Sequence, residues 1–216
     1  MTASEANRAL PRGPHQLSRE QVARSQRQRL LEATTDVVAE RGYVKTTVAH
    51  IIARAGVSRA TFYELFADRE ACFHAAYRAN AELVAEVLAA ELERMRTSGE
   101  RDPLARLDRL LHVYLRSLHD APTLARVFLV EVYAAGPAAI DQRRESLEQF
   151  VDIVAETHRG ETGLLGTEPD QRFAAQVIVG AVSSLVTNAV GAGDADLLLE
   201  LHEPLMRLAR EITRKS

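Results

Sequence analysis

The chain of 216 residues is long enough to bury a core without disulfides or metals. Its single cysteine, Cys72, excludes an intramolecular disulfide, and its first residues lack the apolar run of a secretory signal, so we expect a cytoplasmic protein. The net charge of −3 is unevenly spread: residues 1–70 hold eleven Lys or Arg against eight Asp or Glu, a balance of +3, which leaves −6 for residues 71–216. A modestly basic head on an acidic body suits a protein whose head alone approaches phosphates.

Helical periodicity dominates the chain. Apolar residues recur at intervals of three and four, and alternation with a period of two is nearly absent, so we predict an all-α fold of about nine helices. The first helix is expected over 26–40, with Gly42 at its C-cap, and two short helices are expected over 47–55 and 59–66. Gly56-Val57-Ser58 joins the two short helices.

A much longer helix is predicted to begin after Asp68 and to end at Ser98 and Gly99. Its length of at least about seven turns is enough to join a head to a body. Further helices are expected over 104–118, 122–135, 140–158, 170–190 and 195–213. Pro204 predicts a kink or a break in the last of them.

The chain is expected to have three parts. These are a flexible N-terminal arm (1–20), a helix-turn-helix domain (21–68), and a helical body for ligand binding and dimerisation (69–216).

The segment 173–190 is the longest apolar stretch, but polar residues interrupt it. It falls short of the roughly 20 clean apolar residues that a membrane span needs, so we predict a buried helix and no membrane contact. Small residues would let a second helix approach it closely; they are Ala174, Ala175, Gly180, Ala181 and Ser184. This segment is therefore the best candidate for a dimer interface, and a helix buried within one protomer is the alternative.

The two short helices and their glycine turn are typical of a DNA-reading helix-turn-helix. The residues expected to form its small core are Ile51, Ile52, Val57, Phe62, Leu65 and Phe66. This leaves Arg59, Ala60, Thr61, Tyr63 and Glu64 pointing outward. An arginine fork, a threonine and a phenol on one helix face suit contacts to bases and phosphates, and Ser58 as N-cap favours a phosphate nearby.

A resemblance to a known family rests on six motifs spread over residues 25–75. The motifs are Arg29-Leu30-Leu31-Glu32-Ala33, Glu40-Arg41-Gly42-Tyr43, Thr46-Thr47-Val48, Ala55-Gly56-Val57-Ser58, Thr61-Phe62-Tyr63-Glu64-Leu65-Phe66 and Arg69-Glu70. In order and spacing they resemble the DNA-binding domain of the TetR family of repressors. The resemblance implies that Thr47 begins the helix that braces the reader and can bond a phosphate, that Tyr63 touches the DNA backbone, and that Arg69 contacts a phosphate.

The full set of candidate DNA-binding residues is Lys45, Thr46, Thr47, Ser58, Arg59, Ala60, Thr61, Tyr63 and Arg69. We expect Tyr43 to pack the first helix against the reader rather than to touch DNA. Glu64 either accepts from a cytosine amino group or turns away, and its role stays open. Arg8 and Arg12 either enter a minor groove or belong to a solvated tail, and the tail is favoured.

The resemblance also implies a homodimer through the last two helices, a palindromic operator in double-stranded DNA and a small-molecule effector. A small apolar ligand is expected between the long helix and residues 104–158, with Tyr114, Phe128, Tyr133, Phe150 and His158 as candidate lining residues. Ligand binding would shift the population between two arrangements of the body and so move the heads. Most members of the family repress, so a repressor is expected by analogy.

Two other classes of function compete with a regulator. An enzyme is disfavoured because the seven histidines show no His-Glu-x-x-His spacing, no glycine-rich phosphate loop occurs and Cys72 has no evident partner. We therefore predict no catalytic site, cofactor or metal. A helical small-molecule-binding or protein-interaction module without DNA binding would leave the outward Arg59, Thr61 and Tyr63 unexplained.

Overall fold

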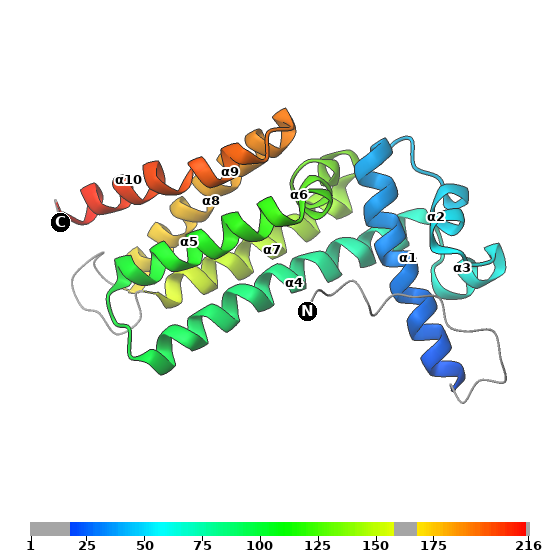
Figure 1. Ribbon diagram of the computed structural model, residues 1–216, viewed down its shortest axis with the longest axis horizontal. Coiled ribbons are helices and arrows are strands. Elements are labelled where there is room, and N and C mark those ends of the chain that lie inside the picture. Colours follow the sequence, from blue (N-terminus) through cyan, green and yellow to red (C-terminus); the bar gives the residue numbers. More distant parts are fainter. Residues whose placement is uncertain (1–17, 158–167, 215–216) are drawn as a thin grey trace.

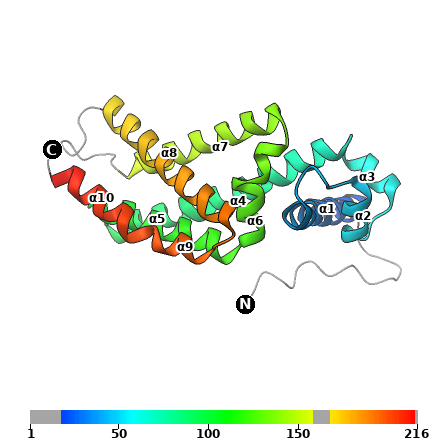
Figure 2. The same ribbon diagram turned by 90° about the horizontal axis from the view of Figure 1, so that it is seen from above.

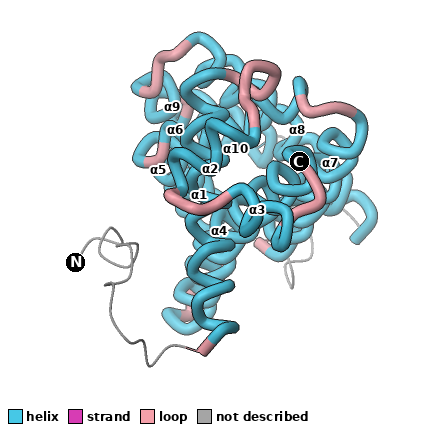
Figure 3. Tube along the Cα trace, turned by 90° about the vertical axis from the view of Figure 1, so that its right-hand side faces the viewer, coloured by secondary structure: helices cyan, strands magenta, loops and turns pink. Residues whose placement is uncertain are grey.

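The computed structural model describes residues 18–157 and 168–214, which are helices and connecting turns without a strand (Figures 1 and 3). Helices α1 to α3 form a head at one end, and the last described helix, α10 (His202–Arg214), ends at the opposite end of an elongated helical body (Figure 1). The all-α prediction is confirmed for this part of the chain. Arg8, Arg12 and His158 lie outside the described residues.

The head consists of α1 (Arg19–Arg41), α2 (Val48–Ala55) and α3 (Arg59–Leu65). The two short helices match their predicted ranges closely, but α1 begins seven residues before the predicted start at 26. A capping box causes the early start: Ser18 Oγ accepts from Gln21 N at 3.2 Å, and Gln21 Oε1 accepts from Ser18 N at 2.8 Å. The first turns of α1 are largely exposed, so apolar periodicity does not reveal them.

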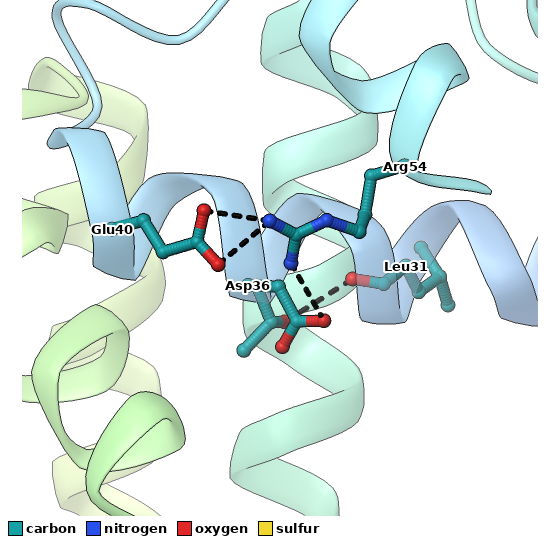
Figure 4. A network of polar contacts seen from close by, with 5 residues as sticks. Leu31, Asp36, Glu40 and Arg54 are labelled. Atoms are coloured by element: carbon teal, nitrogen blue, oxygen red, sulfur yellow. Dashed lines mark hydrogen bonds and ion pairs between the residues drawn. The ribbon is translucent and has the colours of Figure 1, made fainter.

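Ionic contacts hold α2 against α1 beside a small apolar core. The core residues are Leu30, Leu31, Ala33, Ile51, Ala55, Phe62, Phe66, Cys72 and Ala76. Arg54 of α2 reaches two carboxylates of α1, with Arg54 Nη2 at 2.6 Å from Glu40 Oε2 and Nη1 at 3.4 Å from Asp36 Oδ2 (Figure 4). The hydrogen bond from Arg54 lowers the pKa of Glu40. The orientation of α2 is thus fixed by several contacts.

The body begins with α4 (Arg69–Ser98), which runs from the head along most of the body (Figure 1). The remaining elements are α5 (Pro103–Asp120), α6 (Pro122–Leu129), the 3-10 helix η2 (Glu131–Ala134), α7 (Pro137–Glu156), α8 (Glu168–Ala192), α9 (Asp196–Glu200) and α10 (His202–Arg214). The single helix predicted over 122–135 is wrong, because α6 ends at Leu129 and the tighter η2 follows. This turn brings the Glu131 carboxylate to the head, where it accepts from Tyr43 N at 2.9 Å.

The last predicted helix is broken at Leu201, as Pro204 indicated. Pro204 lies in the first turn of α10 and has no N–H to bond the preceding turn. If α9 and α10 are counted as one broken helix, the described residues contain the nine α-helices predicted.

Helix α8 is mostly exposed in the protomer, so the prediction that this apolar segment is buried is wrong for a single chain. Its stretch Asp170–Ala192 has a mean hydropathy of 1.6 and is 28% buried over its most apolar window, and by length and composition it could cross a membrane. Phe173 is 66% exposed and Val177 is 54% exposed. Figure 2 shows α8 and α10 at the outside of the body. An apolar face is therefore left uncovered.

Candidate DNA-binding surface and ligand cavity

Side-chain caps place the reader helix α3 relative to α2. Thr47 Oγ1 accepts from His50 N at 3.3 Å at the start of α2, and Ser58 Oγ accepts from Thr61 N at 3.0 Å at the start of α3. Gly56 has a φ of 63° between the two helices, a conformation that favours glycine. Phe62 is fully buried, so the opposite face of α3 points to solvent.

The outward face of α3 carries most of the predicted reading residues. Arg59, Ala60, Tyr63 and Glu64 are exposed, and Thr61 is half-buried. The guanidinium carbon of Arg59 lies 5.6 Å from the centre of the Tyr63 ring, and Arg59 Nη2 is 3.5 Å from Tyr63 Oη. A forked cation and a phenol thus lie side by side on one accessible surface.

Side-chain hydrogen bonds from Thr46 and Arg69 stabilise the turn before α2. Lys45 and Thr47 are exposed, whereas Thr46 is 1% exposed and donates its hydroxyl to Gly42 O at 2.9 Å. Arg69 Nη1 donates to Tyr43 O at 3.1 Å and to Thr46 O at 2.6 Å. In this arrangement the Thr46 and Arg69 side chains bind the turn that presents Lys45 and Thr47.

Tyr43 joins the head to the body. Its buried ring meets Phe73 of α4 edge-on, with ring centres 4.8 Å apart, and the Arg69 guanidinium carbon lies 4.3 Å from the centre of the Tyr43 ring. Tyr43 therefore packs inside the protein as expected, but against α4 and not against the reader α3. The backbone N–H of Tyr43 donates to Glu131 Oε2, and Glu131 Oε1 forms an ion pair with Arg126 at 3.0 Å. Glu131 was not singled out in the sequence, because its role depends on a residue far away along the chain.

Gly42 lies beside Glu131 and has a φ of 80°, a backbone conformation that favours glycine. A Cβ built on it would lie 3.4 Å from Glu131 Oε2, which is an ordinary contact distance. A second link ties α4 to α7: Gln142 Nε2 donates to His74 O at 2.9 Å, and Gln142 Oε1 lies 2.9 Å from His74 Nδ1. The head, α4, η2 and α7 are therefore connected by polar contacts.

An apolar cavity of about 60 Å³ lies among α4, α5, α7 and α8. Its lining residues are Leu88, Leu107, Leu110, Leu111, Tyr114, Leu147, Phe150, Ile153, Val154, Ile178, Val179, Val182 and Ser183. A groove of about 330 Å³ shares four of these lining residues, Leu107, Leu111, Ile178 and Val182, and is also lined by α10.

Only some of the residues predicted to line the ligand cavity do so in the structure. Tyr114 and Phe150 both line the cavity, with ring centres 6.0 Å apart, and burial raises the pKa of the Tyr114 phenol. Phe128 lies behind the lining, 6.1 Å from Phe150 and stacked on Tyr77. Tyr133 is 53% exposed and is not among the lining residues; it accepts from Arg143.

No group of three or more His, Cys, Asp or Glu side chains suited to hold a metal ion occurs within 18–157 and 168–214. Cys72 is buried with its sulfur 3.1 Å from Thr34 Oγ1, and burial raises the pKa of its thiol to about 11. The described part of the chain therefore offers no cluster for metal chemistry and no reactive thiolate.

These features define a protein with a helix-turn-helix head and a helical body that contains a cavity. A capped reader helix, a glycine turn and a bracing helix on a three-helix head form a helix-turn-helix domain, and a separate helical body contains an apolar cavity.

Comparison with known proteins shows what the chain is similar to. Residues 30–76 match the model of the bacterial regulatory proteins of the tetR family, so the head is similar to the DNA-binding domain of that family. It is 25% identical over 134 residues to the HTH-type transcriptional regulator RutR of Escherichia coli strain K12. That match covers 62% of this chain and 60% of RutR, so the chain spans less than two thirds of this relative's length.

Solved structures share the fold over most of the chain. The fatty acid degradation regulator FadR from Bacillus halodurans is 25% identical, with a TM-score of 0.66 over 85% of this chain and 93% of that one. FadR from Bacillus subtilis, solved in complex with stearoyl-CoA, is 21% identical, with a TM-score of 0.68 over 84% of this chain and 96% of that one. The likeness therefore includes the helical body as well as the head.

Proposed function

We propose that this protein is a dimeric, ligand-responsive transcription regulator of the cytoplasm, acting as a repressor, that binds a palindromic operator in double-stranded DNA. The outward face of α3, where Arg59 and Tyr63 lie together above a buried Phe62, is the observation that carries the proposal. A helix that is capped at its N-terminus by Ser58 and exposes a guanidinium and a phenol has the chemistry of a groove reader.

The proposed contacts divide into two groups. Arg59, Ala60 and Thr61 face the bases. The phosphate contacts are made by Lys45, Thr47, Ser58 and Tyr63. Thr46 and Arg69 support these contacts, because their side chains hold the backbone of the preceding turn. A phosphate contact by Arg69 would use Nε or Nη2 of its guanidinium, because Nη1 donates to both carbonyls.

We propose that two copies pair through α8 and α10. Both helices expose large apolar side chains, including Phe173 and Val177 of α8 and Leu208 of α10. Exposed small residues, Gly180 and Ala181, permit close helix approach. Gln176 and Asn188 are also exposed on α8, and such amides suit a protein interface better than lipid. Pairing would present two α3 helices to successive major grooves.

The cavity among α4, α5, α7 and α8 is the proposed effector site. Its lining suits the apolar part of a ligand, and the Bacillus subtilis relative of similar fold holds stearoyl-CoA. The cavity of about 60 Å³ must enlarge to take such a ligand, and this displaces the helices that line it. Because α7 contacts α4 through Gln142 and η2 contacts the head through Glu131, the displacement would change the position of the head.

The test is selection of duplex DNA from a random library by the full chain at two salt concentrations. We expect enrichment of a palindromic site and weaker binding at the higher salt, because cations near phosphates release counterions. If no duplex is preferred at either salt, DNA binding is refuted. The cavity would then support the second candidate, a helical small-molecule-binding module without DNA.

A further inference from the structure

Arg143 of α7 is a buried cation without a counter-ion in the described structure. Three charged side chains are buried there: Glu91, Glu131 and Arg143. Glu91 pairs with Arg109 at 2.6 Å, and Glu131 pairs with Arg126 at 3.0 Å. Arg143 is 4% exposed and bonds only neutral groups within 18–157 and 168–214.

The contacts of Arg143 satisfy most of its hydrogen bonds but not its charge. Nε donates to Tyr133 Oη at 3.0 Å and Nη1 donates to Phe128 O at 3.3 Å. Nη2 donates to Ser183 Oγ at 2.7 Å and lies 3.5 Å from Thr187 Oγ1. A guanidinium has five N–H groups, so these four contacts leave donor capacity. Burial of a cation among neutral groups is costly, and an anion that reached it would remove part of that cost.

Arg143 is not itself a lining residue of the effector cavity, but it contacts the cavity wall through Ser183. Ser183, which accepts its shortest hydrogen bond, lines the cavity together with Tyr114. Tyr77 is fully buried nearby, and its hydroxyl lies close to Arg143 and Ser146 without forming a hydrogen bond of good geometry. Burial raises the pKa of both phenols, and the positive charge of Arg143 opposes this rise, so both remain neutral donors. The rest of the cavity wall is aliphatic or aromatic.

We propose that the effector is an apolar monocarboxylic acid whose carboxylate pairs with Arg143 while its hydrocarbon part occupies the cavity. This inference rests on the proposed function, because it names the ligand class of the same site. A guanidinium fork and a carboxylate match in charge and in geometry. A coenzyme A thioester has a neutral carbonyl where the acid has its charge, so it would not pair with Arg143 through its acyl end.

Arg143 also connects α6, η2, α7 and α8, and a purely structural role would explain these contacts equally well. The two roles differ in one respect. A structural arginine is indifferent to the charge of the ligand, whereas a carboxylate-binding arginine discriminates between an acid and its uncharged amide.

The test is calorimetric titration of the full chain with octanoate, decanoate and dodecanoate, with the matching primary amides, and with dodecanoyl-CoA. We expect at least one acid to bind about tenfold or more tightly than its amide, as an ionic hydrogen bond predicts. In Arg143→Gln, which keeps donors but loses the charge, the preference should disappear. Arg144→Gln, which removes an exposed charge from the same helix, should retain it.

Equal affinity for acid and amide, or binding of none of the acids, would overturn the inference. Binding of the thioester alone would overturn it too, while leaving the regulator intact. Should Arg143→Gln fail to fold, the comparison of acid and amide on the wild-type chain decides by itself. DNA selection by the unliganded chain tests the proposed function separately, so failure of one proposal is distinguishable from failure of the other.

Discussion

Arg59 and Tyr63 are the two side chains whose removal should weaken DNA binding most directly. Arg59→Ala removes a fork that we assign to a base edge, and we expect operator binding to weaken by about 1–3 kcal/mol. Tyr63→Phe removes only a hydroxyl that we assign to a phosphate contact, so a smaller loss of about 1 kcal/mol is expected. Fluorescence anisotropy on the selected duplex measures both.

A matched control separates a local contact from a change in net charge. Arg116, on α5 in the body, is 57% exposed at its side chain and is remote from α3. Arg116→Ala should leave the affinity within about twofold of wild type, since distant exposed charges are screened. If Arg59→Ala and Arg116→Ala bind equally well, α3 is not the reader.

Cys72 gives a prediction about pH. Burial raises the pKa of its thiol to about 11, above the value of about 8.5 expected in the unfolded chain. Because the folded state prefers the neutral thiol, this stabilisation is complete below about pH 8.5 and is lost as the pH rises toward the folded pKa. Cys72→Ala should therefore lose less stability than wild type between pH 8 and pH 10 in urea unfolding. An equal loss in both proteins would show that Cys72 ionises normally.

At the scale of secondary-structure elements, η2 and the turn after α1 form the contact between head and body. Glu131→Ala leaves the buried Tyr43 N–H without its acceptor, and we expect the free energy of unfolding to fall by about 1–3 kcal/mol. Glu131→Gln retains an oxygen that can accept and should cost less. Urea unfolding measures both losses, and two variants as stable as wild type would contradict the proposed contact.

The helices themselves could be predicted wherever apolar periodicity or a cap lies within one segment. Thr47, Gly56 and Ser58 are local signals, and the structure confirms the helix boundaries that they predict. The early start of α1 depends on Ser18 and Gln21, which precede the buried part of the helix, so a search for apolar stripes could not find it.

The polar side chains of the body could not be predicted in the same way. Glu131 acts on Tyr43, 88 residues away, and Arg143 acts on Ser183, 40 residues away. Neither arginine nor glutamate has a sequence signature for such a contact. The aromatic residues were predicted to line the cavity because of their residue type alone, which does not tell which of them face it. The structure places Tyr114 and Phe150 in the cavity wall and leaves Tyr133 exposed.

At the scale of the whole molecule, the exposed apolar face of α8 should hold two protomers together. Val177 of α8 is 54% exposed, and Leu83 of α4, which is 52% exposed, serves as its control position outside α8. We expect Val177→Glu to be monomeric and Leu83→Glu to be dimeric in sedimentation velocity, because a charge disrupts an apolar interface only where one exists. Dimers in both variants would place the interface elsewhere, and circular dichroism checks that both remain folded.

The measurement that tests the central claim most directly is binding of the wild-type chain to its selected palindrome and to a copy with five base pairs inserted between the half-sites. Five base pairs are about half a turn of B-DNA, so the insertion moves one half-site to the opposite face of the duplex. A dimer that reads both half-sites with its two α3 helices should lose about a hundredfold or more in affinity, since one head then loses its base contacts. Equal affinity for the two duplexes would contradict the account of a dimeric operator-binding regulator.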